Sequence, residues 1–325
     1  MTTFDINASS ILNSRSWKKG KSIIISIVRW CILLSIGYIV LYPLFYMITS
    51  SLSTKESFLD PTSVWIPKVI TLGNFSFMYK VMDYGNALWA TFRVEIISAL
   101  IEVVTCAIVA YGFARFKFPG KKLFTGLLFL TILVPSQMII IPLMVNFSKL
   151  DVLGILSLFN TITGIDLRLN LLGTPWTFYL PSLFANGLQS GILIYIYIQF
   201  FKGLPHELEE AAWIDGAGPW RTFFSIAVPS SGVVILTVTV FSMIWHWNDY
   251  LLASIYMEAG YPLSVTMRKL TELLNYNNVY LTPDRPECMA YIMTACLMFI
   301  VPPLIFYIIV QRWFVESIDR VGITG

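Results

Sequence analysis

The stretch Glu207-Leu-Glu-Glu-Ala-Ala-Trp-Ile-Asp-Gly-Ala-Gly-Pro-Trp-Arg-Thr-Phe-Phe-Ser-Ile-Ala-Val-Pro229 is the longest polar-rich island between strongly apolar segments in the second half of the chain. Three glutamates in its first four residues place negative charge where a helix dipole is positive. Gly216 ends that helix, and Gly218-Pro219 begins another, because proline suits a first-turn position. The stretch therefore predicts two short helices with a break between them.

The second of these helices has one apolar face. Trp220, Phe223, Phe224 and Ala227 follow one another at the i, i+3, i+4 and i+7 spacing, and Pro229 ends the pattern. A short amphipathic helix on a membrane protein needs a cover for such a stripe. A lipid surface and the groove of a partner subunit both provide one, and the local sequence leaves the two open.

The spacing within this stretch resembles a known motif. Glu210-Ala211-Ala212, three residues, Gly216, nine residues, Ile226, one residue and Val228-Pro229 is similar to the EAA loop of permease subunits in binding-protein-dependent ABC importers, with only Val228 departing from Leu. The resemblance implies a coupling helix that docks on a cytoplasmic ATPase. The residues implied in that contact are Glu210, Ala211, Ala212, Asp215, Gly216, Trp220, Phe223, Phe224, Ile226 and Pro229.

Composition places most of the chain in a membrane. Of its 325 residues, 56% are hydrophobic and 13% are charged, against roughly 25% charged in a soluble domain. The net charge of +3 comes without a basic block, which argues against nucleic acid as a partner. The four cysteines and two histidines have no metal-site spacing, and no phosphate-binding Gly-x4-Gly-Lys-Ser/Thr motif occurs, so any ATP that drives this protein binds another chain.

Apolar runs predict an all-α membrane protein with six transmembrane helices. The loop after the second run carries Arg115, Lys117, Lys121 and Lys122, which the positive-inside rule assigns to the cytoplasm, together with both termini. We expect a cytoplasmic tail at 1–22, a permease domain at 23–314 that contains the loop 204–229, and a tail at 315–325. The spans are expected at about 23–46, 88–113, 123–147 with a proline kink, 184–201, 232–257 and 288–310, with outer loops at 49–86 and 258–287 and surface-lying or re-entrant segments within 150–187.

Other segments extend the resemblance over most of the chain. Residues 110–115, Pro135-Ser-Gln137, 200–205 and 247–250 are similar to the carbohydrate class of these permeases, and most of all to maltose permease G-type subunits, whereas 154–176 and 275–287 look longer than usual. The resemblance implies the type I ABC importer permease fold in a prokaryotic cytoplasmic membrane. It also implies a non-catalytic subunit without a cofactor, which works with a second homologous permease, an ATPase dimer that binds ATP and Mg²⁺, an extracytoplasmic solute-binding protein and membrane lipid.

A few polar residues are candidates for the path of the substrate. They are Glu102, Gln137, Gln189, Asn248, Asp249 and Tyr250. Glu102 lies inside a span and is either a pathway group or half of a structural pair with the partner permease. Glu95 and Arg93 are expected to stay wet near the outer interface. The Trp245–Tyr250 segment interrupts the fifth span, as a helix break or as a sugar contact.

Aromatic rings and uncharged hydrogen-bonding groups suit a neutral oligosaccharide or polyol-like solute. A permease for glycerol phosphate or peptide is the neighbouring hypothesis. A phosphate-bearing solute calls for Arg or Lys within the spans, and only Arg93 is a candidate. A secondary transporter without an ATPase or a membrane scaffold would leave the 207–229 stretch unexplained, and the six runs show no inverted repeat.

Overall fold

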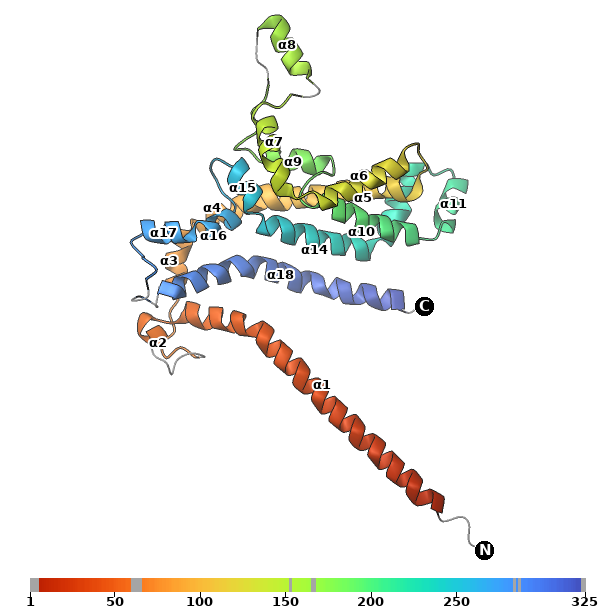
Figure 1. Ribbon diagram of the computed structural model, residues 1–325, viewed down its shortest axis with the longest axis vertical. Coiled ribbons are helices and arrows are strands. Elements are labelled where there is room, and N and C mark those ends of the chain that lie inside the picture. The colour runs from red at the N-terminus through yellow and green to blue at the C-terminus, as the bar shows by residue number, and fades with distance from the viewer. Residues whose placement is uncertain are drawn as a thin grey trace. The chain divides into compact units, whose positions relative to one another are not determined.

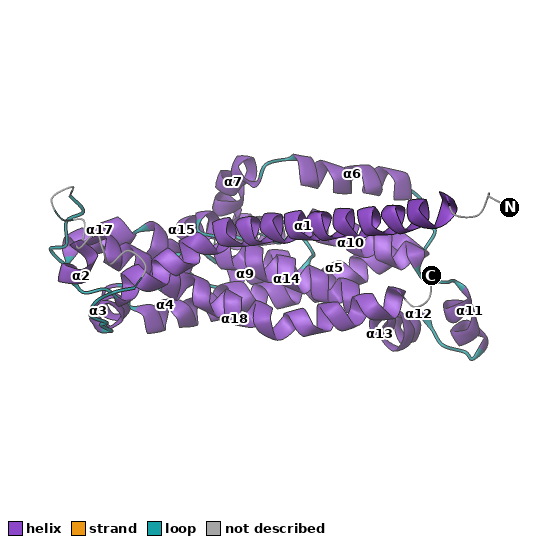
Figure 2. Ribbon diagram, turned by 90° about the horizontal axis from the view of Figure 1, so that it is seen from below, coloured by secondary structure: helices purple, strands orange, loops and turns teal. Residues whose placement is uncertain are grey.

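The computed structural model describes residues 6–59, 66–151, 154–164, 168–282, 285 and 288–322, and every regular element among them is a helix. Two isolated β-bridges, Ser53 with Ile70 and Leu150 with Leu169, are the only strand-like pairings in this part of the chain. Figure 2 accordingly shows helices joined by loops. The predicted all-α class holds for the residues that the structure describes.

Three helical stretches in the described residues are long and apolar enough to cross a membrane. They are 21–52 within α1 (Ile6–Leu52), the continuous run 84–115 made of α4 (Tyr84–Thr91), the π-helical η2 (Phe92–Ile96) and α5 (Ile97–Arg115), and 289–313 within α18 (Met289–Gly322).

Two further stretches qualify only as bent pairs of helices. One joins α6 (Lys121–Leu133) to α7 (Ser136–Ser148) at 102°, and the other joins residues 219–230 to α14 (Gly232–Asn248) at 82°. The first bend falls at Pro135, which confirms the proline break expected in the third run. Counting each bent pair as one span gives up to five candidates in the described residues.

The predicted fourth span is shorter than expected. Its helix, α10 (Ser190–Gly203), begins six residues after Phe184, because Ala185 and Gln189 take left-handed backbone conformations with φ of 52° and 61°. Its 14 residues extend about 21 Å, less than the roughly 30 Å of a hydrocarbon core. Length and composition alone therefore do not give six spans.

The chain forms two units, 1–75 with 281–297, and 76–280 with 298–325, so that α3 (Gly73–Val81) and α18 contribute to both. In the first unit, the end of α1 is tied to the segment after α2 (Lys55–Leu59). The Thr71 N–H donates to the Leu52 carbonyl at 2.9 Å, and the Asn74 side chain donates to the carbonyls of Ser51 and Ser53 at 2.9 and 3.0 Å.

The second unit is built on α5, α10 and α14, which lie side by side (Figure 1). Small residues on α5 let the neighbouring helices approach closely, as is common between spans. Those that are buried are Ser98, Ala99, Cys106, Ala107 and Ala110. Aromatic rings fill the end of this core, where Tyr111 meets Phe201 and Phe223 at centroid distances of 5.5 and 5.0 Å.

Short helices replace two of the segments expected as loops or surface-lying pieces. In the first, the helices are α8 (Ile155–Thr163) and α9 (Trp176–Leu183); in the second they are α16 (Leu263–Arg268) and α17 (Leu270–Tyr276). A further short helix, α15 (Leu251–Tyr256), lies at the end of the expected fifth span. Asp151 caps α8, because its carboxylate accepts the Leu156 and Ser157 N–H groups at 2.9 and 3.0 Å. A second apolar cluster, containing Phe147, Phe178 and Tyr256, joins α7, α9 and α15.

Candidate functional site

The 207–229 segment folds as α11 (Glu207–Ile214), α12 (Pro219–Thr222), the π-helical η3 (Phe223–Ala227) and the start of α13 (Val228–Ser230). The turn between α11 and α12 is centred on Gly216, whose φ is +78°. The Gly216 N–H donates to the Trp213 carbonyl at 3.0 Å, and the Ala217 N–H donates to the Ala212 carbonyl at 2.9 Å. Such bonds around a left-handed glycine are typical of the C-terminal end of a helix. Two helices with a break at Gly216 are therefore confirmed.

The apolar stripe predicted on the second helix is divided in the structure. Phe223 and Ala227 are buried in the core, whereas Trp220 and Phe224 are 63% and 56% exposed and stack with centroids 6.2 Å apart. Trp220 and Phe224 are four residues apart, as are Phe223 and Ala227, so each pair forms its own row along the helix, and only the row of Phe223 and Ala227 faces the core. Of the other residues implied in ATPase contact, Ala212 and Ile226 are half-buried, and Glu210, Ala211, Asp215, Gly216 and Pro229 are exposed.

Arg115, the last residue of α5, holds the start of this segment. Its Nε lies 2.9 Å from Glu209 Oε1 with both side chains at most 3% exposed, an ionic contact without hydrogen-bond geometry. Its Nη2 donates to the Leu204 carbonyl at 2.8 Å, and its Nη1 lies 3.1 Å from His206 Nε2. We call these four residues the Arg115 anchor. The sequence analysis missed Glu209, which is buried while its neighbour Glu210 is exposed.

A second ionic cluster lies between the helices of the core. His246 of α14 has Nδ1 3.1 Å from Glu95 Oε2 and Nε2 3.0 Å from Glu102 Oε2. The three residues, which we call the buried triad, are between 0 and 1% exposed. The expectation that Glu95 stays wet is wrong, because η2 turns it inward onto His246, whereas Arg93 beside it is exposed. Glu102 has a partner within this chain, and His246 was not among the predicted site residues.

Glu102 accepts further hydrogen bonds. The Ser190 hydroxyl donates to its Oε1, and the Ser242 hydroxyl lies 3.3 Å from its Oε2 and 3.3 Å from the Ala99 carbonyl. The other carboxylate, Glu95, has one buried oxygen, Oε1, without a hydrogen-bond partner in the described structure.

A cavity of about 500 Å³ lies against the buried triad, bounded mainly by α6, α7, α9 and α10. His246 forms part of its wall, as does Ser190. Gln137 and Gln189, both predicted for the substrate path, line it and are exposed, as is Asn186. None of the residues that line it is Lys or Arg. The size falls within the range of small-molecule sites.

The other predicted path residues lie at the break after α14 instead. The Asn248 side chain donates to the Ile244 carbonyl at 2.7 Å, the buried Asp249 accepts the Leu252 N–H at 3.1 Å, and Tyr250 is 46% exposed. Asp249 has extended backbone between α14 and α15, so the predicted interruption of the fifth run is confirmed. None of the three is among the residues that line the cavity.

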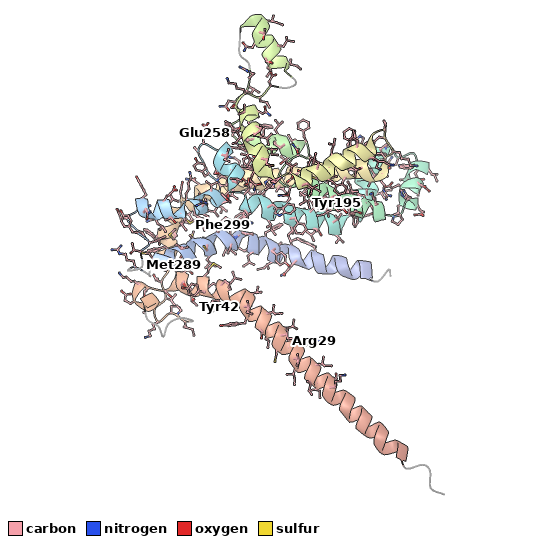
Figure 3. The ribbon with its side chains drawn as sticks, in the orientation of Figure 1. Arg29, Tyr42, Tyr195, Glu258, Met289 and Phe299 are labelled. Carbon is pink, nitrogen blue, oxygen red and sulfur yellow. The ribbon has the colours of Figure 1, made fainter. Side chains whose placement is uncertain are left out.

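Close contacts fix the wall between α6 and α10. Tyr195, labelled in Figure 3, packs on Phe129 with ring centroids 5.5 Å apart. At Gly191 a Cβ would stand 2.7 Å from Thr131 Oγ1 and 2.9 Å from a side-chain carbon of Ile132, so only a hydrogen atom fits there. The glycine therefore sets how near α10 comes to α6 at the cavity.

Residues 103–320 match the model of the family described as the binding-protein-dependent transport system inner membrane component. The chain belongs to this family. It is thus a multi-pass inner-membrane protein and the non-catalytic permease component of an importer that uses a binding protein.

Curated relatives cover nearly the whole chain. The sn-glycerol-3-phosphate transport system permease protein UgpE of Yersinia pestis is 27% identical over 297 residues, which are 88% of this chain and 94% of that one. The trehalose transport system permease protein SugB of Mycobacterium tuberculosis is 28% identical over 299 residues, 91% and 97% of the two chains. The arabinooligosaccharides transport system permease protein AraQ of Halalkalibacterium halodurans is 25% identical over 297 residues, 89% and 93%.

Solved structures support the fold. A chain of a bacterial ABC transporter involved in the import of the acidic polysaccharide alginate superposes with a TM-score of 0.66 at 20% identity, covering 90% of this chain and 98% of that one. A second alginate transporter structure, in complex with a pentasaccharide-bound periplasmic protein, gives 0.56 at 17% identity, covering 92% and 93%. The chain has the fold of an ABC importer permease.

Proposed function

We propose that this chain is the permease subunit of an ATP-driven importer that carries a neutral sugar or oligosaccharide across the inner membrane by alternating access. The observation that carries the substrate class is the cavity beside α6 and α10. Its exposed polar groups are uncharged, and no Lys or Arg lines it. Amides and hydroxyls next to apolar walls suit the hydroxyls and apolar faces of sugars.

The path within this proposal begins with Gln137, Gln189 and Asn186, which face the cavity. Glu102 acts behind the wall through Ser190 and His246. Asn248, Asp249 and Tyr250 keep α14 and α15 apart at the break, and a sugar contact there is a secondary role. The narrower kinship with maltose permease G-type subunits is part of the same proposal.

The 207–229 segment is the coupling element in this proposal. Its exposed Trp220 and Phe224 offer an apolar stack to the groove of an ATPase, and Glu210 and Asp215 border it. The Arg115 anchor passes the movement of α11 to α5. ATP and Mg²⁺ bind to a pair of ATPase subunits, and a second homologous permease completes the membrane part.

The substrate test is ATP hydrolysis by the reconstituted complex, with its binding protein loaded in turn with a neutral sugar, a phosphorylated sugar and a peptide. We expect stimulation by the neutral sugar. UgpE, whose name gives a phosphate ester, makes the phosphorylated sugar the important competitor. Stimulation by the phosphorylated sugar or the peptide alone overturns the sugar class and leaves the permease assignment intact.

Six spans with both termini in the cytoplasm complete the proposal, with the permease domain at 23–314 between two tails. Single cysteines at Ser14 and Thr324 should resist an impermeant thiol reagent in intact cells. A cysteine in the outer loop should react with the same reagent. The exposed Glu56 is a better position for it than the neighbouring Ser57, because Ser57 is buried and accepts the Val69 N–H at 3.1 Å. Labelling of either terminus from outside would contradict this topology.

A further inference from the structure

The charge of the buried triad follows from its two contacts. Each of the contacts of His246, to Glu95 at 3.1 Å and to Glu102 at 3.0 Å, needs one proton between nitrogen and oxygen. Two carboxylates and an imidazole that hold only these two protons carry one net negative charge, whichever atom holds each proton. Glu102 accepts from Ser190 and Ser242 as well, which concentrates that charge on its side of the triad.

This charge lies directly behind the wall of the cavity. Ser190, which donates to Glu102, and His246 both line it. A Cβ built on Gly187, also in the lining, would stand 2.8 Å from Glu102 Oε1. A further titratable side chain on this part of the chain is the carboxyl of Asp249, 8% exposed, which cannot supply a positive charge. The lining itself contains no Lys or Arg. The net negative charge of the triad, in which His246 is already counted, therefore acts on the cavity without a Lys or Arg in the lining to offset it.

We propose that the buried triad makes the cavity repel anions, and that Glu102 is a specificity-determining residue that excludes phosphorylated and carboxylated solutes. This proposal rests on the sugar-importing function above. Rejection by an unfavourable charge is a common way to discriminate between ligands of similar shape. Of the three named relatives, one is named for a phosphate ester and two for sugars, so the solutes in these names differ in charge.

A purely structural role is the competing explanation. In that case the triad only fastens α5 to α14, and a neutral pair of the same shape would serve as well, because buried ion pairs often contribute little net stability. The two explanations differ in one measurable property. Only a charge filter makes the reactivity of a group in the cavity depend on the charge of the incoming reagent.

The experiment uses the variant Asn186→Cys, because Asn186 is exposed, lines the cavity and precedes Gly187. The four native cysteines are replaced, and the assembled complex is held in nanodiscs, so that both faces are accessible. Neutral, cationic and anionic methanethiosulfonate reagents of similar size are the probes. The variant Asn275→Cys, at an exposed position of α17, gives the intrinsic rate of each reagent. No transport substrate is needed, so failure of the sugar assignment cannot be mistaken for failure of the filter.

After this correction, the anionic reagent should react with the Asn186→Cys variant about tenfold more slowly than the neutral one, as expected for one unit charge several ångströms away in partly hydrated protein. Glu102→Gln should remove the difference, and Ser242→Ala, which takes a hydroxyl from the same carboxylate, should preserve it. If Glu102→Gln fails to assemble, Glu95→Gln removes the same charge. Equal rates in the parent, a difference that survives both glutamine variants, or no labelling by any reagent would each overturn the proposal.

Discussion

The run 84–115 takes part in two ionic clusters, and they differ in their surroundings. The buried triad joins Glu95 and Glu102 to His246 on α14 and is closed to solvent, whereas the Arg115 anchor joins the end of α5 to a segment whose neighbouring residues are exposed. Both use buried charge, so removal of one partner leaves the other uncompensated. The difference indicates that the same run is fixed to the core by one cluster and tied to the 207–229 segment by the other. Under the proposed function, a movement of that segment would be transmitted to α5.

Removing the imidazole should have the largest effect. His246→Ala leaves two buried carboxylates without the imidazole between them, and only Glu102 keeps hydroxyl contacts, with Ser190 and Ser242. We expect this to lower stability by about 3–5 kcal/mol, the range for breaking a buried pair. The measurement is the thermal unfolding midpoint and the yield of assembled complex in detergent. Ile244→Ala, two residues earlier on α14 and 42% exposed, is the control. An unchanged midpoint for His246→Ala would mean that the triad does not hold α5 to α14.

The next largest effect concerns the Arg115 anchor. Arg115→Lys keeps the charge but cannot reach Glu209, the Leu204 carbonyl and His206 together, since an ammonium lacks the planar fork of guanidinium. We expect transport by the reconstituted complex to fall by about tenfold, as for the loss of a charge-assisted contact of about 1.4 kcal/mol or more. Basal ATP hydrolysis should fall less.

The matched control for Arg115→Lys is Lys202→Arg, an exposed basic residue near the end of α10. Equal losses of transport and of basal hydrolysis in Arg115→Lys would show that the anchor stabilises the fold and does not carry the movement. The two clusters would then differ only in position.

Much of this organisation was predictable from the sequence, because long apolar runs and Gly216 act locally. The apolar runs predicted the all-α class, and the proline within the third run predicted the break at Pro135. Gly216, which can take a left-handed backbone conformation, predicted the turn between α11 and α12. The split stripe was not predictable, because the spacing of these residues shows that they share one side of a helix but not which of its two i, i+4 rows faces the core.

The buried triad was also beyond the sequence, for a different reason. The seven-residue spacing of Glu95 and Glu102 shows that they share a face, but not what that face meets. His246 is 151 positions from Glu95, and only packing of α14 on α5 brings them together. The available signal was a lone histidine in the fifth apolar run of a chain whose second apolar run contains two carboxylates.

A smaller effect is expected at the turn of the 207–229 segment. Gly216→Val places a β-branched residue at φ of +78°, which costs roughly 1–2 kcal/mol or more, although no atom lies within 4 Å of the added Cβ. Because the strain is local, assembly should survive while transport and substrate-stimulated hydrolysis fall several-fold. Gly203→Val, a glycine with nothing near its Cβ and an ordinary φ, is the control. Unchanged transport in Gly216→Val would separate the segment from coupling.

The smallest effect tests the exposed side of the segment alone. Trp220→Ala removes one ring of the stack with Phe224, and neither ring belongs to the core, so the thermal midpoint of the isolated permease should not change. If the stack docks in the ATPase, the affinity of the purified ATPase for the permease should fall about fivefold, the scale of a contact worth about 1 kcal/mol. Phe223→Leu is the matched control, because this residue is 3% exposed and packs on Tyr111 at 5.0 Å. It should lower the midpoint and leave the affinity of the folded fraction unchanged. The reverse pattern, with Trp220→Ala harming stability and Phe223→Leu harming affinity, would assign the docking surface to the face that the structure buries.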